Sequence, residues 1–483
     1  MEPQCPVLPD DVIEDIFTRL PANLAFRCRS LSRDWAAALS SDDFIHRHRR
    51  AANRNSSPRF FRFQSSSTIH TARALAGSPA RPDGVVLLPP VTPSLGCVPK
   101  IITQHCLGLV LLDVYHHEGS RCVYNPSTGH IALLPPSHWT EGRLLPAQRR
   151  YESFGLGYDA RSHKHKVVRI YYRGDRAPAL IQVYVLDDEG FWRAPAAIGR
   201  PQATKPPGWV SEYEPSVFAQ GHIHWMAQKH KPMHDWHWRE TRRGLIVSFS
   251  VADEAFGVVP LPPRVDYHCD YRLTELDGRL CLFRPIVNRF WSGLLPYDVW
   301  ELRDHEAGTW ELRCRIDPNK TSPEVARFIR SGKASPVAAM DDGRRILFME
   351  VNGQSAACSF TYTPATGNME RLPYSNRSRK WPAMPYEENV VSPGRPHEDI
   401  LFSPAATKAL CVALACCPPA PRDLMHLKLV CRSWRAVIES KRFLKLLQAR
   451  TATGAEQVLA MLLNPPSSYN PKHWGIIWSL TAN

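Results

Sequence analysis

The stretch LPDDVIEDIFTRLPANLAFRCRSLSRDWAAALSSDDF, residues 8–44, decides the fold of the N-terminal part of the chain. Asp10 can accept hydrogen bonds from the free N–H groups that begin a helix, and Asp11 and Glu14 add negative charge near its positive end. Apolar residues then recur at steps of one, three and four, the spacing of an apolar stripe on a 3.6-residue helix: Val12, Ile13, Ile16, Phe17 and Leu20. The pattern predicts a helix that ends before Pro21, because proline cannot continue it.

Two further short apolar stripes and a final turn follow in the same stretch. The second stripe, the third stripe and the turn consist, in order, of Leu24, Ala25, Cys28 and Leu31, then Trp35, Ala38 and Leu39, then Asp42 and Phe44. Three short helices in about 40 residues lie near the lower size limit for an independent core. We therefore expect a small helical docking module that needs a partner and carries no chemistry.

The order of these residues resembles the F-box, the motif through which substrate adaptors of cullin–RING ubiquitin ligases hold the Skp adaptor subunit. The resemblance rests on Leu8-Pro9-Asp10, on Leu20-Pro21, on the run RCRSLSR at 27–33 with Trp35 behind it, and on Phe44. Leu31-Ser32 departs from the Val-Cys pair of most F-boxes. An ordinary amphipathic hairpin explains the periodicity equally well, but not this order of residues. The resemblance implies that an adaptor is bound by Leu8, Pro9, Val12, Ile13, Ile16, Phe17, Leu20, Pro21, Leu31 and Trp35.

Composition places the chain among globular proteins of several domains, with 483 residues and a hydrophobic content of 43%. Its 43 prolines outnumber its 26 glycines, which favours short strands joined by rigid turns. No apolar run approaches the ~20 residues that cross a bilayer, and the N-terminus lacks the pattern of an export signal. The 13 cysteines are irregularly placed and indicate no disulfide framework. We expect a protein of the cytosol or nucleus.

The net charge of +14 would suit an acidic partner. Two basic clusters stand out: Arg47, His48, Arg49, Arg50 and Arg54, and then Arg149 and Arg150. A nucleic-acid-associated regulator is therefore an alternative, but no aromatic-interleaved basic stripe accompanies the charge. Attraction to an acidic protein surface is the more economical interpretation.

The middle of the chain changes character near residue 100. Residues 51–99 contain serine, arginine and proline and are expected to be a connector, whereas 100–390 reads as short strands separated by turns, as in a sandwich, barrel or propeller. The clearest predicted strands are Leu107–Val114, Val167–Tyr172, Ile181–Leu186, Ile223–Met226, Leu245–Val251, Arg279–Phe283, Tyr297–Leu302 and Ile346–Val351.

A repeated hairpin supports a propeller. The segment YNPSTGHIALLP at 124–135 recurs as YTPATGNMERLP at 362–373, with a degenerate copy at 249–262. Proline fixes one corner of such a turn and glycine takes the left-handed corner. A second hairpin type is predicted at Gly190-Phe191-Trp192 and Gly308-Thr309-Trp310. Together with GHIHW at 221–225, the region resembles the F-box-associated β domain of plant adaptors, a complete or incomplete kelch-like propeller whose loops capture substrate.

Catalytic and metal-binding patterns are weak. The histidines of 222–237 invite a metal site, but no cysteine pair lies nearby and the family segment explains the first two, so no metal or cofactor is expected. Cys411, Cys416 and Cys417 are expected to be buried thiols. A propeller enzyme would need carboxylates around its channel, yet the candidates fall where turns are expected: Asp187, Asp188, Asp253, Glu254, Asp341 and Asp342.

The C-terminal part repeats the second half of the opening module. Residues 427–443, LKLVCRSWRAVIESKRF, place Trp434 and Phe443 at the same offset from Trp35 and Phe44, without the Leu-Pro-Asp opening. This segment is either a partial second F-box or a helical hairpin that packs on the propeller and no longer docks a partner; the missing opening favours the second interpretation.

The sequence thus predicts an α+β multidomain protein. The expected divisions are a three-helix F-box (1–50), a connector (51–99), a kelch-like β-propeller domain (100–390), a degenerate F-box-like helical segment (395–465) and a tail (466–483). The resemblance implies a non-enzymatic substrate adaptor of an Skp–cullin–F-box ligase, with a protein target of unknown identity and no membrane partner. The nucleic-acid-associated regulator and the propeller enzyme remain the alternatives.

Overall fold

The computed structural model describes residues 10–54, 58–65, 68–73, 84–87, 100–113, 121–135, 151–172, 178–187, 191–199, 202–210, 214–228, 244–263, 271–284, 296–332, 334–350, 359–372 and 383–394. The chain divides into two units, and every described helix and strand belongs to the first, which comprises residues 1–186 and 192–394. None of the helices in these ranges has the length and apolar character of a membrane span.

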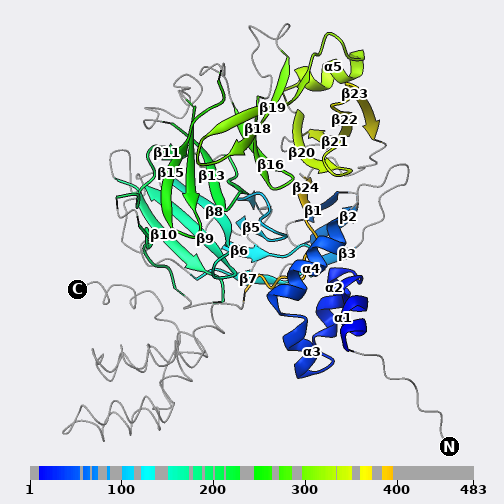
Figure 1. Cartoon of the computed structure of the whole chain (residues 1–483), viewed down its shortest axis with the longest axis vertical. Helices are drawn as coiled ribbons and strands as arrows, with labels where there is room; N and C mark the ends of the chain where they lie inside the picture. Colours follow the sequence, from blue (N-terminus) through cyan, green and yellow to red (C-terminus); the bar gives the residue numbers. More distant parts are fainter. Residues whose placement is uncertain are drawn as a thin grey trace, which may run out of the picture. The chain divides into compact units, whose positions relative to one another are not determined.

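Four helices form the N-terminal helical module, residues 10–54 (Figure 1). They are α1 (Asp10–Thr18), α2 (Ala22–Cys28), α3 (Arg33–Ala38) and α4 (Asp42–Asn53). The three expected helices are present, but the expected last turn is a fourth helix of 12 residues that passes the predicted boundary at residue 50. Ser32 and Ser41 begin α3 and α4 by accepting hydrogen bonds from the backbone N–H groups of Trp35 and Phe44.

Six antiparallel sheets make up a β-propeller in the described part of the chain. The first sheet contains β24 (Ala383–Tyr386), β1 (Arg59–Ser65), β2 (Thr68–Arg73) and β3 (Gly84–Leu87), and the second contains β4 (Lys100–Ile101), β5 (Val110–Asp113), β6 (Arg121–Tyr124) and β7 (Ile131–Leu133). The third contains β8 (Tyr151–Asp159), β9 (Lys164–Tyr172) and β10 (Leu180–Val185), and the fourth contains β11 (Trp209–Val210), β12 (Val217–Ala219), β13 (His222–Gln228), β14 (Gly244–Ser250) and β15 (Ala255–Val259). The fifth contains β16 (Arg272–Leu276), β17 (Arg279–Phe283), β18 (Tyr297–Asp304) and β19 (Thr309–Ile316), and the sixth contains β20 (Ala334–Met340), β21 (Arg345–Glu350), β22 (Ser359–Thr363) and β23 (Asn368–Leu372). Helix α5 (Pro323–Arg330) precedes β20. We number these sheets 1 to 6.

Apolar clusters join each sheet to the next and close the ring. At every junction, buried residues of the two neighbouring sheets belong to one apolar cluster. The examples are Phe61 and Val110 for sheets 1 and 2, Leu111 and Leu156 for sheets 2 and 3, Val168 and Ile223 for sheets 3 and 4, Ile246 and Leu282 for sheets 4 and 5, Tyr297 and Phe348 for sheets 5 and 6, and Leu347 and Phe60 for sheets 6 and 1. Gly155 of β8 permits close approach of sheets 3 and 4, because a Cβ at that position would collide with Trp225 and Ile223. The core is therefore a continuous series of junctions between sheets.

The expected connector over residues 51–99 is wrong, since β1, β2 and β3 lie within it. Sheet 1 is completed by β24 from the other end of the domain, with Arg59 paired to Tyr386 and Phe61 to Met384. The strands therefore begin at Arg59 and not near residue 100. Only β1 has a partner that is remote in sequence, β24, whereas β2 pairs with its chain neighbours β1 and β3. The serine, arginine and proline content of this stretch led to the expectation of a connector.

Local patterns elsewhere predicted strands correctly. The eight predicted strands overlap β5, β9, β10, β13, β14, β17, β18 and β21. Both copies of the repeated hairpin are confirmed: Gly129 and Gly367 have φ of 79° and 71°, and Tyr124 pairs with Ile131 as Tyr362 pairs with Met369. The degenerate copy is the β14–β15 hairpin, but its left-handed residue is Glu254, with φ of 55°, and Gly257 lies within β15.

The two tryptophans of the second hairpin type each donate a hydrogen bond across a junction between sheets. The Trp192 indole donates a hydrogen bond to the carbonyl of Pro135 at 2.9 Å, across sheets 2 and 3. The Trp310 indole donates to the carbonyl of Pro260 at 2.7 Å, across sheets 4 and 5. Pro135 ends the first copy of the repeated hairpin, and Pro260 lies two residues before the end of the degenerate copy, so the two sequence motifs meet in space at the junctions.

Candidate functional site

The predicted adaptor-binding residues separate into a partly buried group and an exposed group. Phe17, Leu20 and Trp35 pack against the buried core of the module, where Ala25 and Phe44 are almost fully enclosed. The rings of Phe17 and Trp35 meet edge to face, with centroids 5.1 Å apart. These three side chains therefore hold the helices together.

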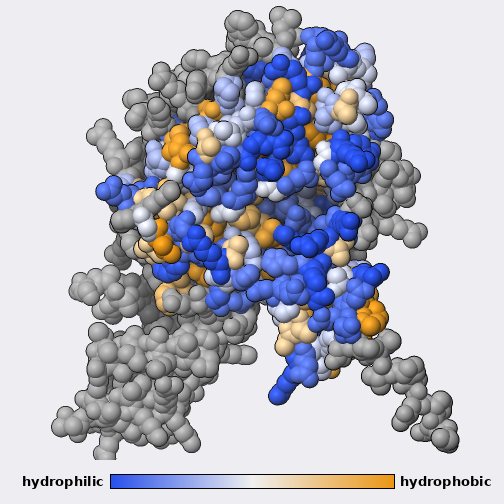
Figure 2. All heavy atoms as spheres, in the orientation of Figure 1, coloured by the Kyte–Doolittle hydropathy of each residue, from blue (hydrophilic) through white to orange (hydrophobic). Residues whose placement is uncertain are grey.

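The exposed group offers apolar surface to a partner. Val12 and Ile16, one turn apart on α1, are 40% and 45% exposed, and Leu31 after α2 is 64% exposed. Leu24 of α2, which the resemblance did not single out, is 42% exposed. We call these four residues the apolar face; Figure 2 shows hydrophobic surface over α1. Burying side chains of this kind stabilises a complex by on the order of 1 kcal/mol or more each.

The other predicted binding residues are less informative. Pro21 is exposed at the start of α2, and Ile13 is half-buried. Leu8 and Pro9 lie outside the described residues, as do Arg149, Arg150, Asp188, Cys411, Cys416, Cys417 and the whole segment 395–465 with Trp434.

A short segment behind β24 ties the module to the propeller. We call residues 387–391 the strap. The Glu388 carboxylate accepts a hydrogen bond from the backbone N–H of Ala22 at 2.7 Å, which satisfies a free donor at the start of α2, and it pairs with the Arg59 guanidinium. The Asn53 amide at the end of α4 donates to the carbonyl of Glu388 and accepts from its N–H, both at 2.9 Å.

The strap also contributes to the core of the module. The Val390 side chain is fully buried among Ala22, Leu39 and Phe44. Arg29 donates hydrogen bonds to the carbonyls of Val390 and Leu39, at 2.9 and 2.8 Å. The helical module is thus completed by residues that follow the propeller in sequence, which the sequence patterns did not indicate.

The opposite side of the strap holds the first repeated hairpin. The Asn125 amide donates to the carbonyl of Asn389 at 3.0 Å, and the backbone N–H of Asn389 donates to the Ser127 hydroxyl at 3.0 Å. The Asn389 amide donates to the carbonyl of Leu107 at 2.7 Å. These bonds fix the module to sheet 2 through one short segment.

The basic cluster of α4 is largely engaged within the protein. Arg47 pairs with Glu14 of α1 at 2.5 Å and with Asp43 at 2.8 Å. Arg49 lies 3.6 Å from Glu387 of the strap, and His48 is buried, its Nε2 2.9 Å from the carbonyl of Leu20. Arg47 and Arg49 thus form ion pairs and His48 is enclosed, whereas Arg50 and Arg54 of the same cluster stay exposed.

The acidic residues considered for an enzyme occupy turns, as expected. Asp187, Asp341 and Asp342 have φ between 53° and 59°, which is left-handed turn geometry. Glu254 differs from the expectation of a solvated corner, because it is buried and holds Lys166 at 2.9 Å and Arg193 at 2.6 Å. Burial would raise the pKa of Glu254, but hydrogen bonds from Arg193, the Ala196 N–H and Lys166 lower it to about 2. The ionised Glu254 carboxylate therefore links sheets 3 and 4 through Lys166 and Arg193, and we call these three residues the Glu254 clasp.

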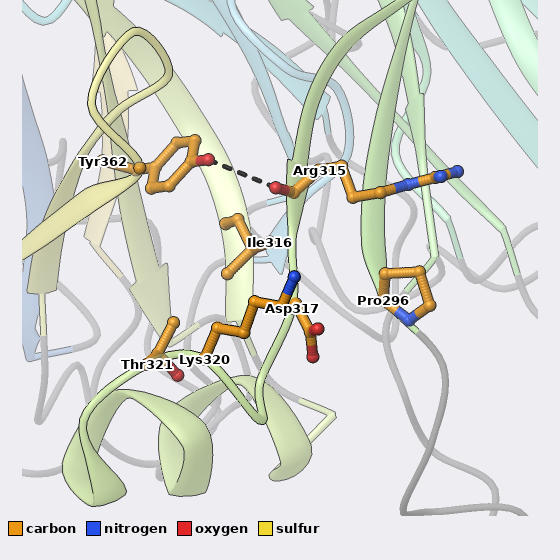
Figure 3. A pocket seen from close by; sticks show the side chains of 8 residues that line it. Pro296, Arg315, Ile316, Asp317, Lys320, Thr321 and Tyr362 are labelled. Atoms are coloured by element: carbon orange, nitrogen blue, oxygen red, sulfur yellow. Dashed lines mark hydrogen bonds between the residues drawn. The ribbon is translucent and has the colours of Figure 1, made fainter.

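A cavity of about 430 Å³ opens where sheets 5 and 6 meet (Figure 3). It is lined by Pro296, Arg315, Ile316, Asp317, Lys320, Thr321, Tyr362 and Gly367. The Tyr362 hydroxyl donates to the carbonyl of Arg315 at 3.2 Å and closes one wall. Apolar surface, a hydroxyl and an amine around a cavity of this size suit the binding of a peptide side chain.

Comparison with known proteins gives the same two parts. The model of the F-box associated beta propeller domain matches residues 91–381, and the F-box domain model matches residues 6–47 and 410–446. F-box protein At4g22390 of Arabidopsis thaliana is 24% identical over 362 residues, which cover 71% of this chain and 81% of that protein. F-box protein CPR1 of the same plant is 26% identical over 317 residues, covering 62% and 70% of the two chains.

A solved prolyl endopeptidase also matches, with 15% identity, a TM-score of 0.31 and coverage of 58% of this chain and 36% of that one. A similarity of this degree carries no argument about activity. The propeller model covers more than half of the 483 residues, and sheets 2 to 6 lie within the matched range. The chain belongs to the family of plant F-box proteins that carry an F-box-associated β-propeller.

Proposed function

We propose that this protein is the substrate-recognition subunit of an Skp–cullin–F-box ubiquitin ligase and is not itself an enzyme. The helical module docks an Skp-type adaptor, and the propeller holds a protein target for ubiquitination, in the cytosol or nucleus. The observation that carries the proposal is the apolar face, which stays exposed although the core beneath it is complete.

The mechanism is an increase in effective concentration. One protein holds the ligase and the target together, so that ubiquitin transfer becomes effectively intramolecular. Because the strap hydrogen-bonds to the module on one side and to sheet 2 on the other, the target is held in a restricted position relative to the ligase. A flexible tether would give a lower effective concentration.

The test compares substitution by aspartate at two apolar sites of similar exposure. Ile16→Asp alters the apolar face, and Val258→Asp alters the outer surface of β15, where Val258 is 48% exposed. We expect Ile16→Asp to weaken binding of the purified full chain to a purified Skp-type adaptor at least about 30-fold, the loss expected of a binding hot spot worth about 2 kcal/mol. Val258→Asp should bind as the wild type does.

Failure of the wild type to bind the adaptor, or equal binding by both variants, would contradict the proposal. The double variant Leu8→Ala/Pro9→Ala tests the start of the motif in the same assay and should also weaken binding.

We further propose that the second F-box match, residues 410–446, no longer docks an adaptor. It contains Val430-Cys431 and Trp434 but lacks the Leu-Pro-Asp opening. We expect one adaptor per chain by native mass spectrometry, with no change on Trp434→Ala. Two adaptors on the wild type and one on the variant would overturn this part of the proposal.

A further inference from the structure

Three ionisable side chains meet at the edge of sheets 4 and 5, away from the apolar face. His222 begins β13, and His305 and Glu306 lie in the turn between β18 and β19. One potential ligand atom from each lies within 4.8 Å of the other two. The sequence pattern suggested His222 with later histidines and gave no reason to join it to residues 305 and 306.

The two histidine rings are held in parallel contact. Their centroids are 3.7 Å apart and their planes differ by 15°. The His222 Nδ1 lies 2.8 Å from the carbonyl of Gln220, so it is the nitrogen that carries the proton and donates. That bond leaves Nε2 as the lone-pair nitrogen. A histidine oriented by a backbone carbonyl in this way is typical of a metal ligand.

His305 has unsatisfied polar atoms. Both of its ring nitrogens are buried, and neither finds a hydrogen-bond partner among the described residues. His224, fully buried behind it with ring centroids 5.3 Å apart, has an Nε2 in the same condition. Buried polar groups without partners are costly, and a bound ion or water is the usual explanation. A cation ligated by His305 would offset that cost.

We propose that His222, His305 and Glu306 form a binding site for a divalent transition-metal cation of the zinc class. Two imidazole nitrogens and one carboxylate oxygen suit Zn²⁺, which binds nitrogen at ~2.0–2.1 Å and leaves a fourth position for water in such sites. Ligand atoms on a tetrahedral ion at that radius lie about 3.3–3.5 Å apart. Because an imidazole lone pair lies in the plane of its ring, the His222 and His305 rings would turn out of their parallel contact when they bind the ion, and the exposed Glu306 side chain would move to the same spacing.

The backbone around the site is suited to hold it. The Gln220 amide donates to the carbonyl of Leu302 at 3.2 Å, so the turn before β13 is already bonded to β18. The cation would add a link between residue 222 and residues 305 and 306, which belong to different sheets. Its function is therefore structural: it stabilises the junction of sheets 4 and 5.

The experiment is a zinc titration of the demetallated full chain against a chromophoric chelator. The wild type should take up one more tightly bound equivalent than His305→Gln, and Glu306→Gln should weaken that equivalent at least about 10-fold. Glu311→Gln is the matched control, because Glu311 is an exposed carboxylate of the same hairpin that pairs with Arg303 and lies outside the cluster. It should bind zinc as the wild type does.

Thermal unfolding gives a second readout. Zinc should raise the melting temperature of the wild type and of Glu311→Gln, but not that of His305→Gln. Equal zinc stoichiometry in the wild type, His305→Gln and Glu306→Gln would overturn the proposal. Because Glu306 is exposed, its variant should keep the wild-type circular dichroism spectrum, so a loss of zinc there is a loss of the ligand and not of the fold.

Discussion

The helical module exposes a larger share of its large apolar side chains than the propeller does. The module exposes four in 45 residues, namely Val12, Ile16, Leu24 and Leu31. The rest of the described chain, several times longer, exposes only four more, namely Phe191, Ile198, Val258 and Leu312. Apolar surface concentrated on the smaller part indicates a face that a partner covers.

The two parts also differ in how their cores close. Each junction of the propeller is made by neighbouring sheets, and β24 closes the ring. The module is too small to enclose its own core and takes Val390 from the strap. The helical module therefore depends on the strap that follows the propeller for its stability.

The largest expected effect is that of Val390→Asp. A carboxylate would enter the core of the module without a partner, which costs about 3–5 kcal/mol. We expect the module to become sensitive to limited proteolysis and adaptor binding to fall at least about 100-fold, because α1 and α2 lose their support.

The control is again Val258→Asp, the same substitution at an exposed position. It should retain both adaptor binding and protease resistance. A Val390→Asp variant that binds the adaptor normally would show that the module folds without the strap.

A pH titration compares one buried histidine from each part. Burial lowers the pKa of His165 in the propeller to about 4, while a hydrogen bond to Cys106 raises it and Arg49 lowers it. Burial also lowers the pKa of His48 in the module, but there the Leu20 carbonyl and Glu388 favour the charged form. Unfolding therefore takes up protons as the pH falls below about 6.5, so each histidine reduces stability in acid.

The measurement is urea unfolding of the wild type, His165→Gln and His48→Gln at pH 7.5 and pH 5. The wild type should lose stability on acidification, and His165→Gln should lose less, with His48→Gln between the two. Parallel losses in all three proteins would contradict the assignment. The Glu254 clasp should contribute to the pH dependence only below about pH 4.5, because its pKa in the folded protein is about 2.

The residues that could be predicted from sequence are those whose partners lie nearby in the chain. The helices of the module follow from the spacing of Ile13, Phe17 and Leu20, and the hairpin turns follow from Gly129 and Gly367. The apolar periodicity of a helix identifies its apolar residues but does not say which of them are exposed. It therefore could not show that Ile16 is exposed and Phe17 packs against the core.

The contacts that could not be predicted join residues that are remote in sequence. Glu388 with Ala22, Tyr386 with Arg59, and His305 with His222 each depend on closure of the ring. No local propensity encodes such pairs. The sequence named three residues of the apolar face among ten candidates and did not single out Leu24, and it gave no sign of the strap.

A smaller effect is expected for Trp310→Phe in the propeller. The substitution keeps an aromatic ring but removes the indole N–H and leaves the carbonyl of Pro260 without that donor, which costs about 1–3 kcal/mol. Trp192→Phe should cost a similar amount, because Trp192 bonds Pro135 in the same way. Thermal unfolding measures both losses, and adaptor binding should not change. Reduced adaptor binding by these variants would show that the propeller junctions also support the module.

The smallest effect is expected for Gly367→Ala at the second copy of the hairpin. Gly367 has φ of 71° and no atom within 4 Å of the position a Cβ would take, so the substitution is limited by the left-handed backbone alone, at about 1–2 kcal/mol. Gly129→Ala has the same backbone cost, but its hairpin is bonded to the strap through Asn125 and Ser127. We therefore expect both variants to lower the melting temperature and only Gly129→Ala to weaken adaptor binding. Equal adaptor affinity in the two variants would show that the module tolerates distortion of the hairpin that the strap rests on.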